Sequence, residues 1–190
     1  DDADLRRAVD CALAGSFDST GQRCTASSRL IVTDGIRDRF VAALTEAMAG
    51  LRVGHALDPE SRIGPLVSAG QLERVDGHVA RARSEGARLV SGGGPLRRDR
   101  PGHYYAPTLF ADADPAMAVA REEIFGPVAF VIPAVDYDHA LALANDTPFG
   151  LSAAICTASL ARAEHFRRNA EAGMVMINLP TSGADYHVPF

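Results

Sequence analysis

The sequence contains no lysine, so all 19 of its basic side chains are arginines. A Schiff-base mechanism needs a lysine amine, and a phosphate-binding P-loop needs the lysine of its GK[ST] motif. Both chemistries are therefore excluded for this chain.

Long apolar runs and an excess of positive charge are also missing. No run approaches the roughly 20 apolar residues of a membrane-spanning helix. The opening residues, DDADLRRAVD, are acidic, whereas a signal peptide begins with basic residues. The 24 acidic side chains outnumber the basic ones and give a net charge of -5. We therefore expect a cytoplasmic protein whose partners include neither nucleic acid nor a membrane.

Cysteine is scarce, since Cys11, Cys24 and Cys156 are widely spaced and form no CxxC pair. An odd count with this spacing argues against a disulfide framework or a structural zinc site. The six histidines contain no HxH or HxxxH pair, so we expect no metal site. The glycine-rich stretch SGGG is followed by Pro95 and arginines, which favours a plain loop over a dinucleotide-binding turn.

What the sequence does contain is an alternation of helical and strand patterns. We expect Asp34 to cap one helix, and Ser68 with Gln71 to form a capping box at the next. Amphipathic spacing predicts helices over residues 4–17, 34–48, 68–82, 135–146 and 159–170. Apolar, β-branched runs predict strands over residues 28–33, 87–91, 106–110, 127–133, 151–157 and 174–178.

The last three of these strands are compact apolar runs, which is typical of strands buried on both faces. Buried strands interleaved with amphipathic helices predict an α/β fold, a three-layer domain with a largely parallel sheet flanked by helices. No shift in composition divides the chain, so we expect one domain over residues 1–190.

Cys24 lies in the polar stretch GQRCTAS, between a helical pattern and a strand-like run. A structural cysteine normally occupies an apolar run, as Cys11 does in a helix stripe and Cys156 in an expected buried strand. A loop of small and hydroxyl side chains leaves room for a ligand. Cys24 is therefore the candidate reactive thiol, and a merely semi-buried thiol is the alternative.

A second distinctive stretch is REEIFGPVAF, in which Glu122 and Glu123 precede an apolar pair and a Gly–Pro break. Adjacent side chains point to different sides of the backbone. Either the pair forms a solvated acidic corner, or one glutamate accepts hydrogen bonds from hydroxyl groups, as acidic residues do when they hold a ribose.

Together these stretches resemble the NAD(P)-dependent aldehyde dehydrogenase superfamily. The motifs GQRCTASSRLIV, RIGPLVS, YYAPTLF, EEIFGPV, FGLSAAI and VMINLPTSGADYHVPF follow the family's order over essentially the whole chain. The resemblance implies that Cys24 is the nucleophile. It further implies that Glu123 and Phe125 contact the nicotinamide half of an NAD or NADP cofactor.

The implied reaction oxidises an aldehyde to a carboxylic acid. The thiolate adds to the aldehyde carbon, the backbone N–H of Cys24 stabilises the oxyanion, and a hydride passes to NAD(P). A water activated by a general base then hydrolyses the thioester.

Several family parts are absent from the 190 residues. These are the ELGGK motif with the general base, the oxyanion-hole asparagine, the cofactor-binding domain and the C-terminal oligomerisation arm. We therefore expect the catalytic domain of a longer homo-oligomer, a dimer or tetramer. We expect this domain alone not to complete turnover, and the choice between NAD and NADP to be made on the absent domain.

The tail NLPTSGADYHVPF and the stretch STGQRCTASSR most resemble enzymes that oxidise α-ketoglutaric semialdehyde (2,5-dioxovalerate). The resemblance implies that Thr181 and Phe190 line the substrate pocket, and Arg23 is a candidate for attracting an acidic substrate. Alternatively, residues 178–190 form only a turn-rich connection. Two rival functions are a thiol hydrolase that pairs Cys24 with a histidine, and a non-catalytic packing or oligomerisation domain.

Overall fold

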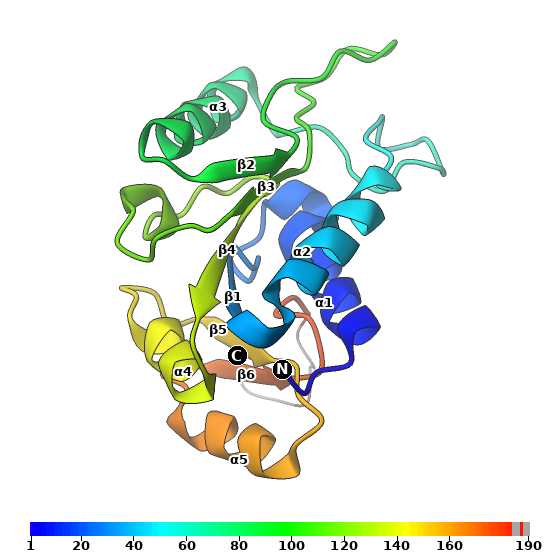
Figure 1. Cartoon of the computed structure of the whole chain (residues 1–190). Helices are drawn as coiled ribbons and strands as arrows, with labels where there is room; N and C mark the ends of the chain where they lie inside the picture. Colours follow the sequence, from blue (N-terminus) through cyan, green and yellow to red (C-terminus); the bar gives the residue numbers. More distant parts are fainter. Residues whose placement is uncertain (184–186, 188–190) are drawn as a thin grey trace.

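A computed structural model describes residues 1–183 and 187, and its strands form two sheets (Figure 1). The larger sheet has the order β1-β4-β3-β2, and the smaller one pairs β5 with β6. All pairs are parallel except β2 with β3. The strands are β1 (Arg29–Thr33), β2 (Arg88–Ser91), β3 (Thr108–Ala111), β4 (Val128–Ala134), β5 (Ser152–Ile155) and β6 (Met174–Ile177).

Five α-helices and two short 3-10 turns accompany these strands in the described residues. They are α1 (Leu5–Phe17), η1 (Asp18–Gly21), α2 (Asp34–Ala49), α3 (Ala69–Ser84), η2 (Ala118–Ala120), α4 (Tyr137–Asn145) and α5 (Leu160–Asn169). The helix and strand patterns of the sequence are thereby confirmed, with boundaries moved by a few residues.

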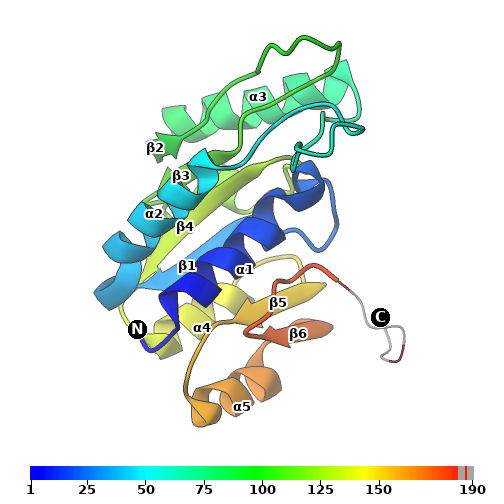
Figure 2. The same ribbon diagram turned by 90° about the vertical axis from the view of Figure 1, so that its right-hand side faces the viewer.

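Central strand β4 is buried on both faces, and its side chains alternate between two hydrophobic clusters. Phe130 and Ile132 join the cluster formed with α3 and α4. Ala129 and Val131 join the cluster formed with α1 and α2. Because helices cover both faces of the larger sheet (Figure 2), the expected three-layer α/β architecture with a largely parallel sheet is confirmed.

Two details of the helix starts differ from the sequence expectation. The N-cap of α2 is Thr33, and Asp34 is instead the first helical residue. Its negative charge interacts favourably there with the positive end of the helix dipole. Ser68 caps α3 by accepting the backbone N–H of Gln71 at 3.2 Å, as expected. The side chain of Gln71, however, turns away from the cap, so the reciprocal half of the capping box does not form.

The expectation that β5 and β6 are buried on both faces is wrong. Most of their residues are half-buried, and Ala154 is exposed. The physical reason is that β5 and β6 form a sheet of only two strands over the described part of the chain. Among the same residues β5 pairs only with β6 and β1 only with β4, so one edge of β5 and one edge of β1 have no neighbour. A cavity lies between those edges, and side chains of both strands line it.

Candidate active site

The loop that carries Cys24 connects η1 to β1 and depends on close contact with a second loop. Gly21 has a φ of +64°, and a Cβ there would lie 2.2 Å from the carbonyl oxygen of Gly126. Only glycine fits such an approach in this backbone conformation. The loop following η1 is therefore held directly against the EEIFGP segment, although the two are about 100 residues apart.

Two glutamine side chains connect both loops to the start of α3. Gln71 donates from Nε2 to the carbonyls of Ile124 (3.1 Å) and Phe125 (2.9 Å). Gln22 accepts the backbone N–H of Val67 at 3.0 Å. Phe125 itself has a φ of +57°, an uncommon conformation for a bulky residue. The bonds from Gln71 therefore help to hold the phenylalanine in a conformation that it would rarely adopt alone.

The two glutamates of the EEIFGP segment have different surroundings. Glu122 forms an ion pair with Arg81 of α3 and lies 3.6 Å from His78. Burial, together with Arg81, lowers the pKa of His78, so that ring favours its neutral form. Glu123 is exposed and forms no hydrogen bond or ion pair with any residue that the structure describes. Its carboxylate is therefore free to accept hydrogen bonds from a ligand.

Five of the six residues expected from the sequence to form the site line one cavity of about 630 Å³. They are Arg23, Cys24, Glu123, Phe125 and Thr181. Cys24 is exposed, and Phe125 is 37% exposed. The cavity has the volume of an ordinary small-molecule site. Phe190, the sixth expected residue, lies outside the described residues.

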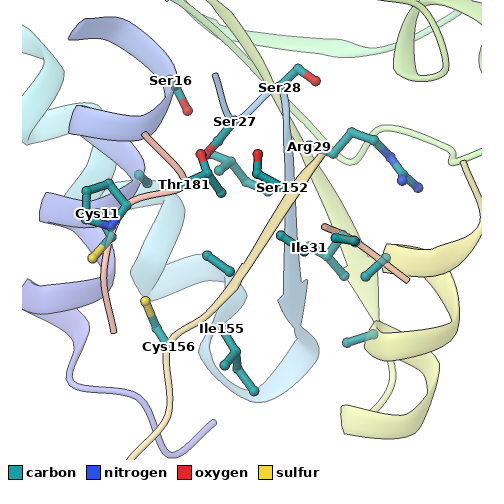
Figure 3. A pocket seen from close by; sticks show the side chains of 18 of the residues that line it. Cys11, Ser16, Ser27, Ser28, Arg29, Ile31, Ser152, Ile155, Cys156 and Thr181 are labelled. Carbon is teal, nitrogen blue, oxygen red and sulfur yellow. The ribbon is translucent and has the colours of Figure 1, made fainter. Parts of the chain in front are cut away.

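Arg23 and Thr181 each form a hydrogen bond to a backbone carbonyl of the protein. Arg23 donates from Nη2 to the carbonyl of Ala14 at 2.7 Å. Thr181 donates to the carbonyl of Thr25 at 2.7 Å, and its oxygen lies 2.7 Å from the hydroxyl of Ser27 (Figure 3). Both side chains therefore hold the Cys24 loop, and their expected role toward substrate stays a prediction.

Comparison with known proteins decides the family of the chain. The profile of the aldehyde dehydrogenase family matches residues 1–190. The chain belongs to the aldehyde dehydrogenase family. It is 44% identical, over all of its length, to an alpha-ketoglutarate semialdehyde dehydrogenase of Haloferax volcanii, and covers 39% of that protein. It is 46% identical over 94% of its length to a betaine aldehyde dehydrogenase of Cereibacter sphaeroides, and covers 36% of that protein.

Solved structures that this chain resembles have the same fold. HpcC from Thermus thermophilus superimposes with a TM-score of 0.95 at 43% identity, over 100% of this chain and 38% of that one. Betaine aldehyde dehydrogenase of Staphylococcus aureus, solved in complex with NAD+, superimposes with a TM-score of 0.96 at 32% identity. This match also covers 100% of this chain and 38% of the other. The chain thus spans somewhat more than a third of the length of these proteins.

The remaining cysteines of this aldehyde dehydrogenase domain are less accessible than Cys24. Cys11 is buried in α1 with 7% of its surface exposed. Burial, together with neighbouring Cys11, raises the pKa of Cys156 to about 12. Cys156 follows β5 and is half-buried, so its expected place inside a buried strand is corrected. Both thiols line the cavity (Figure 3).

Sequence reasoning missed Gln22 and Gln71 as residues that build the site. The sequence did single out Gln71, but its position three residues after Ser68 indicated a capping box and not a contact with the EEIFGP segment. Gln22 belongs to the GQ-x-C motif, yet nothing local predicts that its side chain reaches Val67.

Among the residues that the structure describes, no cluster of three or more His, Cys, Asp or Glu could hold a metal ion. Over the same residues, no helix is long and apolar enough to cross a membrane.

Proposed function

We propose that this domain, within a longer protein, oxidises an aldehyde to a carboxylic acid with NAD(P) as the cofactor and Cys24 as the nucleophile. The observation that carries the proposal is that Cys24, Glu123 and Phe125 meet at one cavity in a chain of the aldehyde dehydrogenase family. Relatives solved with NAD+ support the choice of cofactor.

The surroundings of Cys24 suit attack on a carbonyl carbon. The thiolate adds to the aldehyde to give a thiohemiacetal, whose oxyanion needs a hydrogen-bond donor aimed at it. The backbone N–H of Cys24 donates to no other group among the described residues, so it is available for that oxyanion. After oxidation, a water must hydrolyse the thioester on the sulfur. We place the general base for that step in a part of the longer protein that precedes residue 1.

Glu123 and Phe125 fit the nicotinamide half of the cofactor. The free carboxylate of Glu123 can accept hydrogen bonds from ribose hydroxyls. Phe125 is an exposed aromatic residue that lines the cavity, and an aromatic side chain there can pack against a flat ring. When bound, NAD(P) supplies the acceptor for the hydride of the thiohemiacetal carbon. We expect the remaining contacts to the cofactor, and the choice between NAD and NADP, to come from a separate domain.

For the substrate we propose α-ketoglutaric semialdehyde or another semialdehyde. The relative from Haloferax volcanii, matched over the whole chain, acts on this compound by its name. Arg23 supplies a positive charge at the cavity, and its Nε is buried without a hydrogen-bond partner. We keep Thr181 and Phe190 as expected lining residues of the substrate pocket.

We further propose that the longer protein is a cytoplasmic homo-oligomer, a dimer or tetramer. Over the part of the chain that the structure describes, one edge of β1 and one edge of β5 lie unpaired beside an apolar cavity, and a soluble protein normally covers such surfaces. The rival hydrolase reading gains no support from the cavity, because none of the described residues that line it is a histidine.

The deciding experiment measures NAD(P) reduction by the longer polypeptide that contains this domain, followed through the near-ultraviolet absorbance of the reduced nicotinamide. α-Ketoglutaric semialdehyde and a simple aliphatic aldehyde are supplied in parallel. We expect reduction with wild type and none with Cys24→Ala. Glu123→Gln should raise the KM for the cofactor, whereas Glu122→Gln, the matched control, should raise it far less. Folded protein that reduces no cofactor with either aldehyde would overturn the proposal.

A further inference from the structure

The hydroxyl of Thr181 connects the C-terminal segment to the loop that carries Cys24. Thr181 follows β6, is 8% exposed, and lies 156 positions after Thr25, whose carbonyl accepts its hydrogen bond at 2.7 Å. Thr25 directly follows Cys24 and is itself buried. A backbone carbonyl that is buried beside the nucleophile is therefore paired by a single side chain from a distant part of the chain.

The direction of the second hydrogen bond follows from counting protons. A threonine hydroxyl has one hydrogen and two lone pairs. Because Thr181 donates its hydrogen to Thr25, the 2.7 Å contact with Ser27 requires the Ser27 hydroxyl to donate to Thr181. Figure 3 shows these two hydroxyl groups facing each other. Thr181 is thus both donor and acceptor in a short chain of hydrogen bonds that ends on the loop backbone.

The fold makes room for this chain of hydrogen bonds. A Cβ on Gly15 of α1 would lie 2.5 Å from the Ser27 hydroxyl and 3.5 Å from that of Thr181. The Ser27 N–H also donates to the Gly15 carbonyl at 3.0 Å. The loop is therefore fixed from two sides, by the end of α1 and by the C-terminal segment.

From this geometry we propose that Thr181 is a positioning residue for Cys24, an inference that rests on the proposed nucleophilic role of that cysteine. In this proposal the hydroxyl of Thr181 holds the Cys24 loop in place and does not bind the substrate. Losing it leaves the Thr25 carbonyl without its partner, and the thiol then spends less time in the geometry that attack requires. The loss should reduce turnover with every aldehyde alike, because the hydroxyl is already paired with Thr25 and Ser27.

The test compares Thr181→Val, which removes the hydroxyl at nearly constant volume, with Thr181→Ser, which keeps it, in the longer enzyme. Ser27→Ala removes the second hydrogen bond only. We expect Thr181→Val to lower kcat about fivefold with both α-ketoglutaric semialdehyde and an aliphatic aldehyde, which corresponds to the loss of one hydrogen bond of typical strength. KM should change little, Thr181→Ser should restore kcat, and Ser27→Ala should have a smaller effect.

Hydrogen exchange of the loop amides supplies a readout that needs no activity. The Ala26 and Ser27 N–H groups, which donate to Arg23 and Gly15, should exchange faster in Thr181→Val and at the wild-type rate in Thr181→Ser. A raised KM for the semialdehyde alone, at constant kcat, would identify Thr181 as a substrate contact and overturn the inference. Unchanged kcat and unchanged exchange in Thr181→Val would overturn it equally. Faster exchange in an enzyme whose wild type reduces no cofactor would uphold the loop role and refute the proposed function.

Discussion

At the scale of single residues, the three thiols differ in their exposure to solvent. Cys24 is exposed, Cys11 is buried, and the pKa of Cys156 is raised to about 12. Because the thiolate is the reactive form, Cys156 is almost wholly unreactive at neutral pH. We predict that iodoacetamide alkylates Cys24 well before the other two, measured as the time course of labelled peptides by mass spectrometry. Urea-unfolded protein, the control, should label all three at similar rates. Similar rates in the folded protein would contradict an accessible site thiol.

Sequence reasoning singled out Cys24, Glu123 and Phe125, which line one cavity, because their signal is local. Each lies in a short motif whose polar or glycine-rich character stands out from the neighbouring apolar runs. The role of Gln71 could not be found in this way. A glutamine three residues after a serine is compatible with a capping box, and its actual partners lie 53 and 54 positions away.

At the scale of elements, the two site loops are held together by a glycine contact. Gly21→Ala would place a Cβ 2.2 Å from the Gly126 carbonyl in a left-handed conformation. We predict a loss of about 1–3 kcal/mol in the free energy of unfolding, measured by urea titration. Gly77→Ala is the matched control, because its site in α3 is open and its helical backbone suits alanine. That variant should gain about 0.5–1 kcal/mol. Equal effects of the two substitutions would show that the loop contact is dispensable.

Helices and strands were predicted well as elements because periodicity is a local property of the sequence. The burial of β5 and β6 was predicted wrongly, because a short apolar run cannot reveal whether a neighbouring strand lies beside it. PVAFVIP and LSAAICT look alike as runs. Only the pairing of β4 with strands on both sides, against a single neighbour for β5, separates them.

At the scale of the whole molecule, residues near the N-terminus join the smaller sheet to the rest of the fold. Asp2 precedes α1, yet its carboxylate accepts the Thr157 hydroxyl at 2.6 Å and the Ser159 N–H at 3.1 Å. It also pairs with Arg162 of α5 at 3.1 Å. No local pattern in the opening residues predicts these contacts, because their partners lie more than 150 positions away. The arrangement of the two sheets therefore depends in part on one carboxylate.

This carboxylate makes stability depend on pH in a defined direction. The hydrogen bond from Thr157, followed by the charge of Arg162, lowers the pKa of Asp2 below its ordinary value near 4. A carboxyl group with a lowered folded-state pKa stabilises the fold above its unfolded-state pKa, and the contribution is lost as the pH falls through the folded-state value. We predict that Asp2→Asn unfolds at lower urea than wild type at about pH 7, and that the difference shrinks towards about pH 3. Asp99→Asn, the same charge change in an exposed loop, should show no such pH-dependent difference. If the deficit of Asp2→Asn stayed constant across this range, the side chain would act through its shape and neutral hydrogen bonds, and its charge would contribute nothing to holding the two sheets together.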